Sequence, residues 1–156
     1  MFVPHWLQIV FVVLHVLGAA VWVGGSVALT FIAVPVVRQL TGDTRAAAMR
    51  GLGQRWRPIG WSALLLLVAT GIPLAAHLLP GGGARAGAVF GIKAGGFVAL
   101  VCLAYAHDFV LGPRVAKEIR EGLPQRSRPR LVLVGWASIT LTLAMPILGV
   151  VLAEIA

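Results

Sequence analysis

The stretch from His15 to Pro35, HVLGAAVWVGGSVALTFIAVP, contains no Asp, Glu, Lys or Arg. A helix rises by about 1.5 Å per residue, so this stretch is predicted to cross the ~30 Å hydrocarbon layer of a membrane. Small residues, among them Gly24 and Gly25, let a second helix approach closely. An imidazole inside an apolar helix costs free energy unless it gains a partner, so His15 is a candidate ligand. The alternative is a ring near the outer surface that bonds only a carbonyl or a headgroup.

The composition favours a chain built of such helices. Apolar residues make up 59% of the 156 residues and charged residues 12%. A soluble domain of this length could not bury that much apolar surface, whereas a membrane bundle does not need to. We predict an all-α integral membrane four-helix bundle that forms a single domain. The predicted spans are residues 6–37, 58–79, 88–111 and 131–153.

The connections between the spans are predicted from proline, glycine and charge. We expect a loop over residues 38–57, with a short interfacial helix at 46–52, and an end of the third span at Gly112-Pro113. Pro73 and Pro146 lie inside the second and fourth spans. Each frees a backbone carbonyl there and is expected to kink its helix.

Basic residues are concentrated in two of the connections. Eleven of the thirteen Lys and Arg lie there: Arg38, Arg45, Arg50, Arg55, Arg57, Arg114, Lys117, Arg120, Arg126, Arg128 and Arg130. The positive-inside rule therefore predicts that both termini face outward and that both basic loops are cytoplasmic. Because topology accounts for these charges, we expect no nucleic-acid partner. Trp56, Trp61 and Trp136 are predicted to form an inner interfacial belt.

The N-terminal segment lacks the features of a cleavable signal peptide. It has no Lys or Arg before Arg38, and its apolar run is too long. The single cysteine, Cys102, excludes an internal disulfide and a CxxC metal motif. We expect the protein to reside in a bacterial cytoplasmic membrane.

The third span carries a glycine repeat. Gly87, Gly91 and Gly95 recur at every fourth position and leave a groove along one helix face. Such a groove most often packs against another helix, and it is also a face through which copies of the chain could oligomerise. Lys93 flanks the groove, and its charge could not rest against lipid without reaching toward the interface.

The first and third spans share one spacing. His15 lies 20 residues before Pro35, and Lys93 lies 20 residues before Pro113. If the two helices are in register, His15 and Lys93 lie at the same depth in the outer half of the bilayer.

Depth brings four polar or soft side chains into the outer half, namely His15, His77, Lys93 and Met145. Imidazole binds haem iron and copper alike, and a thioether favours Cu(I) or raises a haem potential. Lys93 could pair with a haem propionate or bind the metal directly. For His77 an interfacial position without a ligand, and for Met145 a gap-filling role in packing, are the alternatives.

A second polar group lies at the inner end of the third span, where Tyr105, His107, Asp108 and Arg114 occur within ten residues. His107 and Arg114 are about two turns apart, so a carboxylate between them is sterically reasonable. The group is either a charge pair that anchors the helix at the headgroups or a second haem or proton-relay site. It lies too far from His15 for both histidines to hold one metal. Neither a nucleophile–base pair nor a phosphate-binding loop occurs, as a hydrolase or an NTPase would need.

Several segments resemble one family. HVLGAAVWVGG, RWRPIGWSALLLLVATGI and IKAGGFVALV, with a proline in the fourth span, resemble the CopD-like four-helix membrane domain, which is itself similar to HemJ-type protoporphyrinogen oxidases. The specific matches are His15, Trp22, Gly24, Gly25, Lys93 and Pro146.

The resemblance implies two activities. CopD-type proteins are associated with copper uptake or tolerance. HemJ-type proteins bind haem b and oxidise protoporphyrinogen, with a first-helix histidine and a third-helix lysine that His15 and Lys93 match. Ala144 and Met145 stand where HemJ-type proteins have an acidic residue. The spacing of tryptophan and proline in the first helix is also closer to that of CopD-like proteins.

From these observations we expect a membrane haem-b protein of CopD-like type that serves electron transfer or acts as an oxidoreductase. Its partners would be the lipid bilayer and a quinone or another membrane redox partner. The alternatives are a copper-handling permease and a scaffold subunit without a cofactor.

Overall fold

The structure is a computed structural model that describes residues 4–81, 83–124 and 126–155. Over these residues the chain is helical and has no strands, as the sequence predicts. Four helical rods in the described chain are long and apolar enough to cross a membrane: His5–Arg38, Gly42–Leu78, Gly83–Arg120 and Arg128–Ile155. By the length and composition of these helices, the chain is an integral membrane protein.

Two of the rods contain a short π-helix. The first consists of α1 (His5–Ala28), η1 (Leu29–Ala33) and α2 (Val34–Arg38), and the third of α4 (Gly83–Tyr105), η2 (Ala106–Leu111) and α5 (Gly112–Arg120). Pro35 and Pro113 each lie two residues after the last residue of a π-turn. A proline lacks the N–H of a helical hydrogen bond and clashes with the preceding turn. The wider π-turn accommodates this disruption and lets each helix continue.

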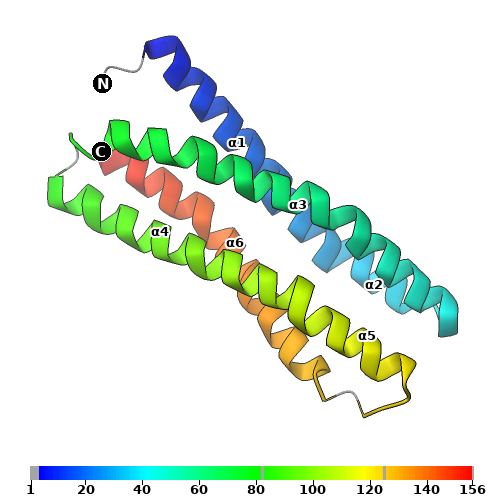
Figure 1. Ribbon diagram of the computed structural model, residues 1–156. Helices are drawn as coiled ribbons and strands as arrows, with labels where there is room; N and C mark the ends of the chain where they lie inside the picture. The colour runs from blue at the N-terminus through cyan, green and yellow to red at the C-terminus, as the bar shows by residue number, and fades with distance from the viewer. Residues whose placement is uncertain (1–3, 82, 125, 156) are drawn as a thin grey trace.

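The rods pair as two helical hairpins (Figure 1). α1 packs along α3 (Gly42–Leu78), and α4 packs along α6 (Arg128–Ile155). Both chain ends lie at one end of the bundle with the turn after α3, and the connections after α2 and α5 lie at the other end. The hairpins meet where α6 contacts α1.

Trp22 occupies the centre of the core between the hairpins. Its indole Nε1 donates to the buried Thr142 hydroxyl at 3.1 Å, which links α1 to α6. Its ring lies 6.0 Å from that of Trp56 and packs in the same cluster as Leu64 and Leu100. The prediction that Trp56 belongs to an interfacial belt is therefore wrong, because this side chain packs inward on Trp22.

Two helices extend beyond their predicted boundaries. The prediction of a loop over residues 38–57 is wrong, because α3 begins at Gly42 and continues through Pro58. The third rod likewise passes Pro113 and ends at Arg120 instead of at the Gly-Pro pair. At 37 residues, α3 is roughly 55 Å long and exceeds the hydrocarbon layer. Hydropathy detects only the part of a helix that lies within the membrane, so the charged extensions escaped the prediction.

The two hairpins repeat one arrangement. The corresponding residues are His15 and Lys93, Gly18 and Gly96, Pro35 and Pro113, and Gly71 and Gly149; in each pair the second follows the first by the same number of residues. Each hairpin also presents a tryptophan to a phenylalanine of the other. The Phe31 and Trp136 rings lie 6.1 Å apart, and the Trp61 and Phe109 rings lie 5.6 Å apart. This crossed pairing indicates an approximate two-fold relation between the hairpins.

Candidate functional site

His15 lies half-buried on α1 and faces α3. Its Nδ1 is 2.8 Å from the Thr70 hydroxyl, which donates its own proton to the Leu66 carbonyl at 2.7 Å. A hydroxyl has a single proton, so with that proton directed at the Leu66 carbonyl the Thr70 oxygen accepts from the ring and Nδ1 carries the hydrogen. In the neutral ring, Nε2 therefore keeps its lone pair. Metal-binding histidines are held in this way, with the other ring nitrogen fixed by a hydrogen bond.

Glycines allow α3 to approach the His15 ring closely. A Cβ on Gly71 would lie 3.3 Å from the ring Cε1. One turn further along α1, a Cβ on Gly18 would lie 3.4 Å from the Leu66 side chain. The ring is thus fixed by packing as well as by its hydrogen bond.

Lys93 occupies the corresponding place in the second hairpin. It is half-buried on α4, and its Nζ lies 3.1 Å from where a Cβ on Gly149 would be. Met145 of α6 packs against α4, with its Cε 2.7 Å from the position of a Cβ on Gly96. Lys93 and Met145 thus pack between the two helices of the second hairpin, as His15 does between those of the first.

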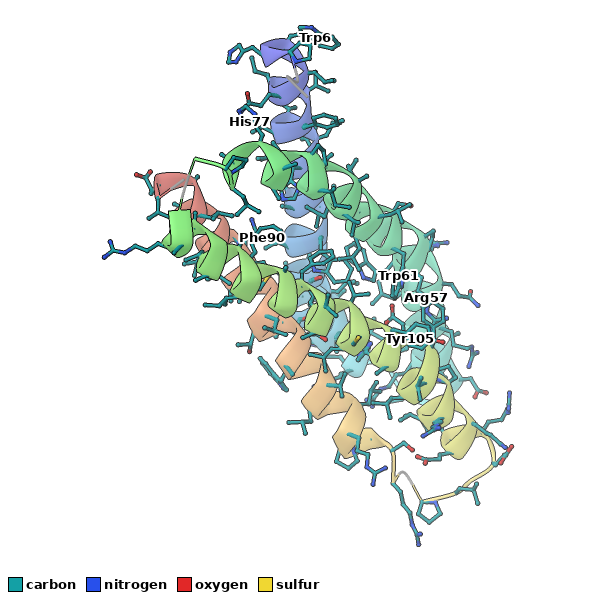
Figure 2. The ribbon with its side chains drawn as sticks, turned by 60° about the vertical axis from the view of Figure 1, so that its left-hand side comes forward. Trp6, Arg57, Trp61, His77, Phe90 and Tyr105 are labelled. Carbon is teal, nitrogen blue, oxygen red and sulfur yellow. The ribbon has the colours of Figure 1, made fainter. Side chains whose placement is uncertain are left out.

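The other predicted member of this cluster lies apart. His77 is exposed near the C-terminal end of α3, at the end of the bundle where the chain termini lie (Figure 2). Within the described ranges, no three His, Cys, Asp or Glu side chains gather into a metal-binding group. The ligands that the fold offers in this region are therefore the His15 and Lys93 nitrogens and the Met145 sulfur.

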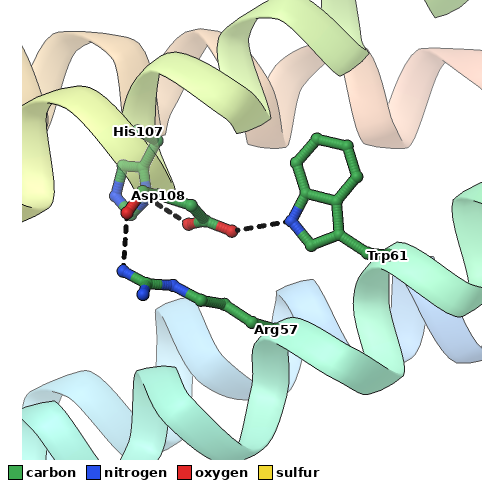
Figure 3. A network of polar contacts seen from close by, with 4 residues as sticks. All are labelled: Arg57, Trp61, His107 and Asp108. Atoms are coloured by element: carbon green, nitrogen blue, oxygen red, sulfur yellow. Dashed lines mark hydrogen bonds and ion pairs between the residues drawn. The ribbon is translucent and has the colours of Figure 1, made fainter.

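A polar network joins the two hairpins toward the end of the bundle that lies away from the chain termini (Figure 3). His107 Nδ1 lies 3.0 Å from Asp108 Oδ1, and the Trp61 indole donates to Asp108 Oδ2 at 3.3 Å. Arg57 donates to the Asp108 backbone carbonyl and lies over the Phe109 ring. Figure 2 shows Arg57 and Trp61 on α3, pointing toward the third rod.

The geometry of η2 explains why Arg57 binds a backbone carbonyl. The Gly112 N–H bonds to the His107 carbonyl, five residues earlier. By the same pattern the Asp108 carbonyl would receive the N–H of Pro113, which does not exist. A buried carbonyl without a donor is costly, and the guanidinium of Arg57 supplies that donor.

Two further residues were predicted for this inner group. Tyr105 lies within the aromatic cluster, 6.5 Å from Trp61 and 5.2 Å from Phe109 by ring centroids. Arg114 is exposed on α5. The arginine of the network is therefore Arg57 of α3, and not Arg114, which is nearer to Asp108 in the sequence.

Comparison with family models, with curated proteins and with solved structures finds no match.

The predicted glycine positions differ in their surroundings. A Cβ on Gly25 would overlap the Trp56 ring, whereas Cβ atoms on Gly24, Gly87, Gly91 and Gly95 would meet nothing within 4 Å. In the single chain, the glycine groove of α4 is therefore open.

Sequence reasoning missed Thr70, Gly71 and Gly149, which surround the two nitrogen side chains. One signal was available: Thr70 is a lone hydroxyl in an apolar run of the second span. Gly71 and Gly149 became recognisable only once the two hairpins could be compared.

Proposed function

We propose that the protein is a membrane haem-b protein of CopD-like type that serves redox chemistry, with His15 as an axial ligand. The observation that carries the proposal is the hydrogen-bond chain from His15 through Thr70 to Leu66. With the Thr70 proton directed at the Leu66 carbonyl, this chain would place the ring hydrogen on Nδ1 and leave the Nε2 lone pair available to iron.

The available ligand set also supports haem. A porphyrin supplies the equatorial ligands of its iron, so a protein needs to contribute only axial ones. His15 offers an imidazole nitrogen from one hairpin, and Lys93 offers an amine at the corresponding position of the other. Lys93 would serve either as the second axial ligand or as the partner of a propionate.

When bound, haem would supply one-electron redox chemistry. The chain would contribute the fixed tautomer and orientation of His15, through Thr70 and the close contact with Gly71. It would also contribute the positive charge of Lys93 in an apolar region. An axial ligand and its hydrogen-bond partner set both the affinity and the potential of such a site.

The charge distribution supports a topology with outward termini in a bacterial cytoplasmic membrane. The basic connections after α2 and α5 lie together at the end opposite the termini (Figure 1). The positive-inside rule assigns that end to the cytoplasm. The His15 region then belongs to the outer half of the bilayer.

The test is the visible spectrum of the full chain, purified in mild detergent from a haem-producing host and also reconstituted with hemin. We expect a Soret band in the wild type and in His77→Ala, and its loss in His15→Ala. Thr70→Val should keep the fold while lowering haem affinity about ten-fold or more, because the ring loses its hydrogen-bond partner.

Other outcomes would refute the proposal. A colourless protein that binds copper stoichiometrically would favour a copper-handling permease. A protein that binds neither would favour a scaffold subunit. A Soret band unchanged in a folded His15→Ala variant, judged by circular dichroism, would show that His15 is not a ligand.

A further inference from the structure

Residues of both π-turns line one cavity, away from His15 and Lys93. Its volume is about 250 Å³, and all four rods contribute to its walls. Thr30 comes from η1, and His107 and Asp108 come from η2. Helices interrupted at corresponding positions of two repeats point to ligand sites in membrane proteins, and π-turns often lie at functional sites.

The first π-turn leaves a backbone acceptor on Thr30, a residue that lines this cavity. By the pattern of η1, the Thr30 carbonyl would receive the N–H that Pro35 lacks. Its counterpart in η2 is the Asp108 carbonyl, to which Arg57 donates. Among the residues that the structure describes, no side chain takes that role at Thr30. The Thr30 carbonyl of the first hairpin could therefore accept a hydrogen bond from a ligand.

Two other polar residues of the lining, Ser138 and His107, also have an atom available for a hydrogen bond with a ligand. The Ser138 hydroxyl oxygen is buried and has no hydrogen-bond partner within the described chain. His107 directs Nδ1 to the Asp108 carboxylate, which leaves Nε2 as an acceptor in the neutral ring. An unsatisfied buried polar group costs free energy, so a ligand that donates hydrogen bonds here would be stabilised.

Charge argues against a bare cation as that ligand. Among the described residues that line the cavity, Asp108 alone is formally charged, and the Arg57 guanidinium lies against its backbone. The two charges offset each other, so the cavity offers hydrogen-bond acceptors without net negative charge. A neutral molecule that carries hydroxyl donors suits this lining better.

The shape and walls of the cavity favour an aromatic ring. Trp22 and Trp56, with ring centroids 6.0 Å apart, both line it. An engineered cavity of about 150 Å³ holds benzene. The present volume therefore accommodates a benzene ring with small substituents.

We propose that this cavity binds the headgroup of a membrane-soluble benzoquinol. The ring lies against the two indoles, and its hydroxyls donate to acceptors that include the Thr30 carbonyl and His107 Nε2. Ser138 is satisfied by the same ligand. The oxidised quinone has no hydroxyl to donate, so the site prefers the reduced form. This binding does not depend on the proposed haem site.

The test measures binding of decylubiquinol and of its oxidised form to the full chain in nanodiscs under argon, with empty nanodiscs as the blank. Gly53→Leu fills the cavity, since Gly53 lines it and a Cβ there meets nothing within 4 Å. Gly51→Leu is the matched control, because Gly51 lies on the same helix with equally open space and outside the lining.

We expect saturable quinol binding in the wild type and in Gly51→Leu, and its loss in Gly53→Leu. Ser138→Ala, which barely alters the fold, should weaken binding about five-fold, as for one neutral hydrogen bond. The quinone should bind about ten-fold more weakly than the quinol. Uptake no greater than by empty nanodiscs, equal affinity for both redox forms, or unchanged binding in Gly53→Leu would overturn the proposal.

Discussion

Adding one methyl group at Gly25 should strongly destabilise the core between the hairpins. The Cβ of Gly25→Ala would lie 2.0 and 2.1 Å from two ring carbons of Trp56. Carbon atoms in contact prefer a separation of about 3.5–4.0 Å. The indole would therefore have to move by roughly 1.5 Å, which is the van der Waals shortfall.

That movement is opposed by the packing around the ring. Trp56 lies against Gly60, one turn further along its own helix, where a Cβ would be only 3.0 Å from Trp56 Cε2. The Trp22 ring packs against the same indole. Overpacking of this kind costs about 1–3 kcal/mol. We expect a loss of that size in the free energy of unfolding of Gly25→Ala.

The neighbouring glycine provides a matched control. A Cβ on Gly24 meets nothing within 4 Å, and alanine is favoured over glycine within a helix by about 1 kcal/mol. Both variants gain this propensity, so they should differ by the overpacking cost alone, about 1–3 kcal/mol, in reversible unfolding in detergent, followed by circular dichroism. Shortening the obstructing ring in a Gly25→Ala/Trp56→Leu double variant should recover part of the loss. Equal stability of the two alanine variants would refute the packing argument.

Two further predictions concern single contacts. Thr142→Val removes the acceptor of the Trp22 indole N–H between the hairpins and should cost about 1 kcal/mol in the same unfolding assay. Thr140→Val should be nearly neutral, because the exposed Thr140 hydroxyl bonds only within its own helix; equal losses would contradict the assignment. Gly71→Ala brings a Cβ to 3.3 Å from His15 Cε1 and should shift the Soret band of a haem-loaded protein with little change in stability. An unchanged spectrum would argue against ligation by His15.

The four spans were predictable because apolar length is a direct requirement of the bilayer. Their ends were not, since a helix that leaves the membrane is limited by local sequence and solvent rather than by hydropathy. The prolines in particular led to wrong predictions of where helices begin and end. Pro58 and Pro113 were expected to begin or end helices, yet both lie within continuous rods, the second two residues after the end of a π-turn.

The candidate site was only partly predictable for a related reason. His15 and Lys93 stood out because titratable groups in apolar helices are rare and costly. Their partners did not, because Thr70 and Gly149 acquire meaning only from the register between paired helices. At the inner end, Arg114 was expected to be the arginine of the polar group because it follows His107 by about two turns. The arginine that contacts Asp108 is instead Arg57 of α3. The spacing of residues along the third rod cannot predict a contact with a different rod.

The approximate two-fold relation separates structural positions from chemical ones. Residues that are identical in both halves, such as Gly71 and Gly149, let the helices approach, and the proline pair follows the π-turns. Corresponding residues that differ carry the polar side chains. His15 of the first hairpin corresponds to Lys93 of the second, and Thr30 corresponds to Asp108. A symmetric scaffold would present equal groups on both sides of its axis. At these corresponding positions the first hairpin instead carries an imidazole and a hydroxyl and the second an amine and a carboxylate, so the two halves of one scaffold offer different chemistry.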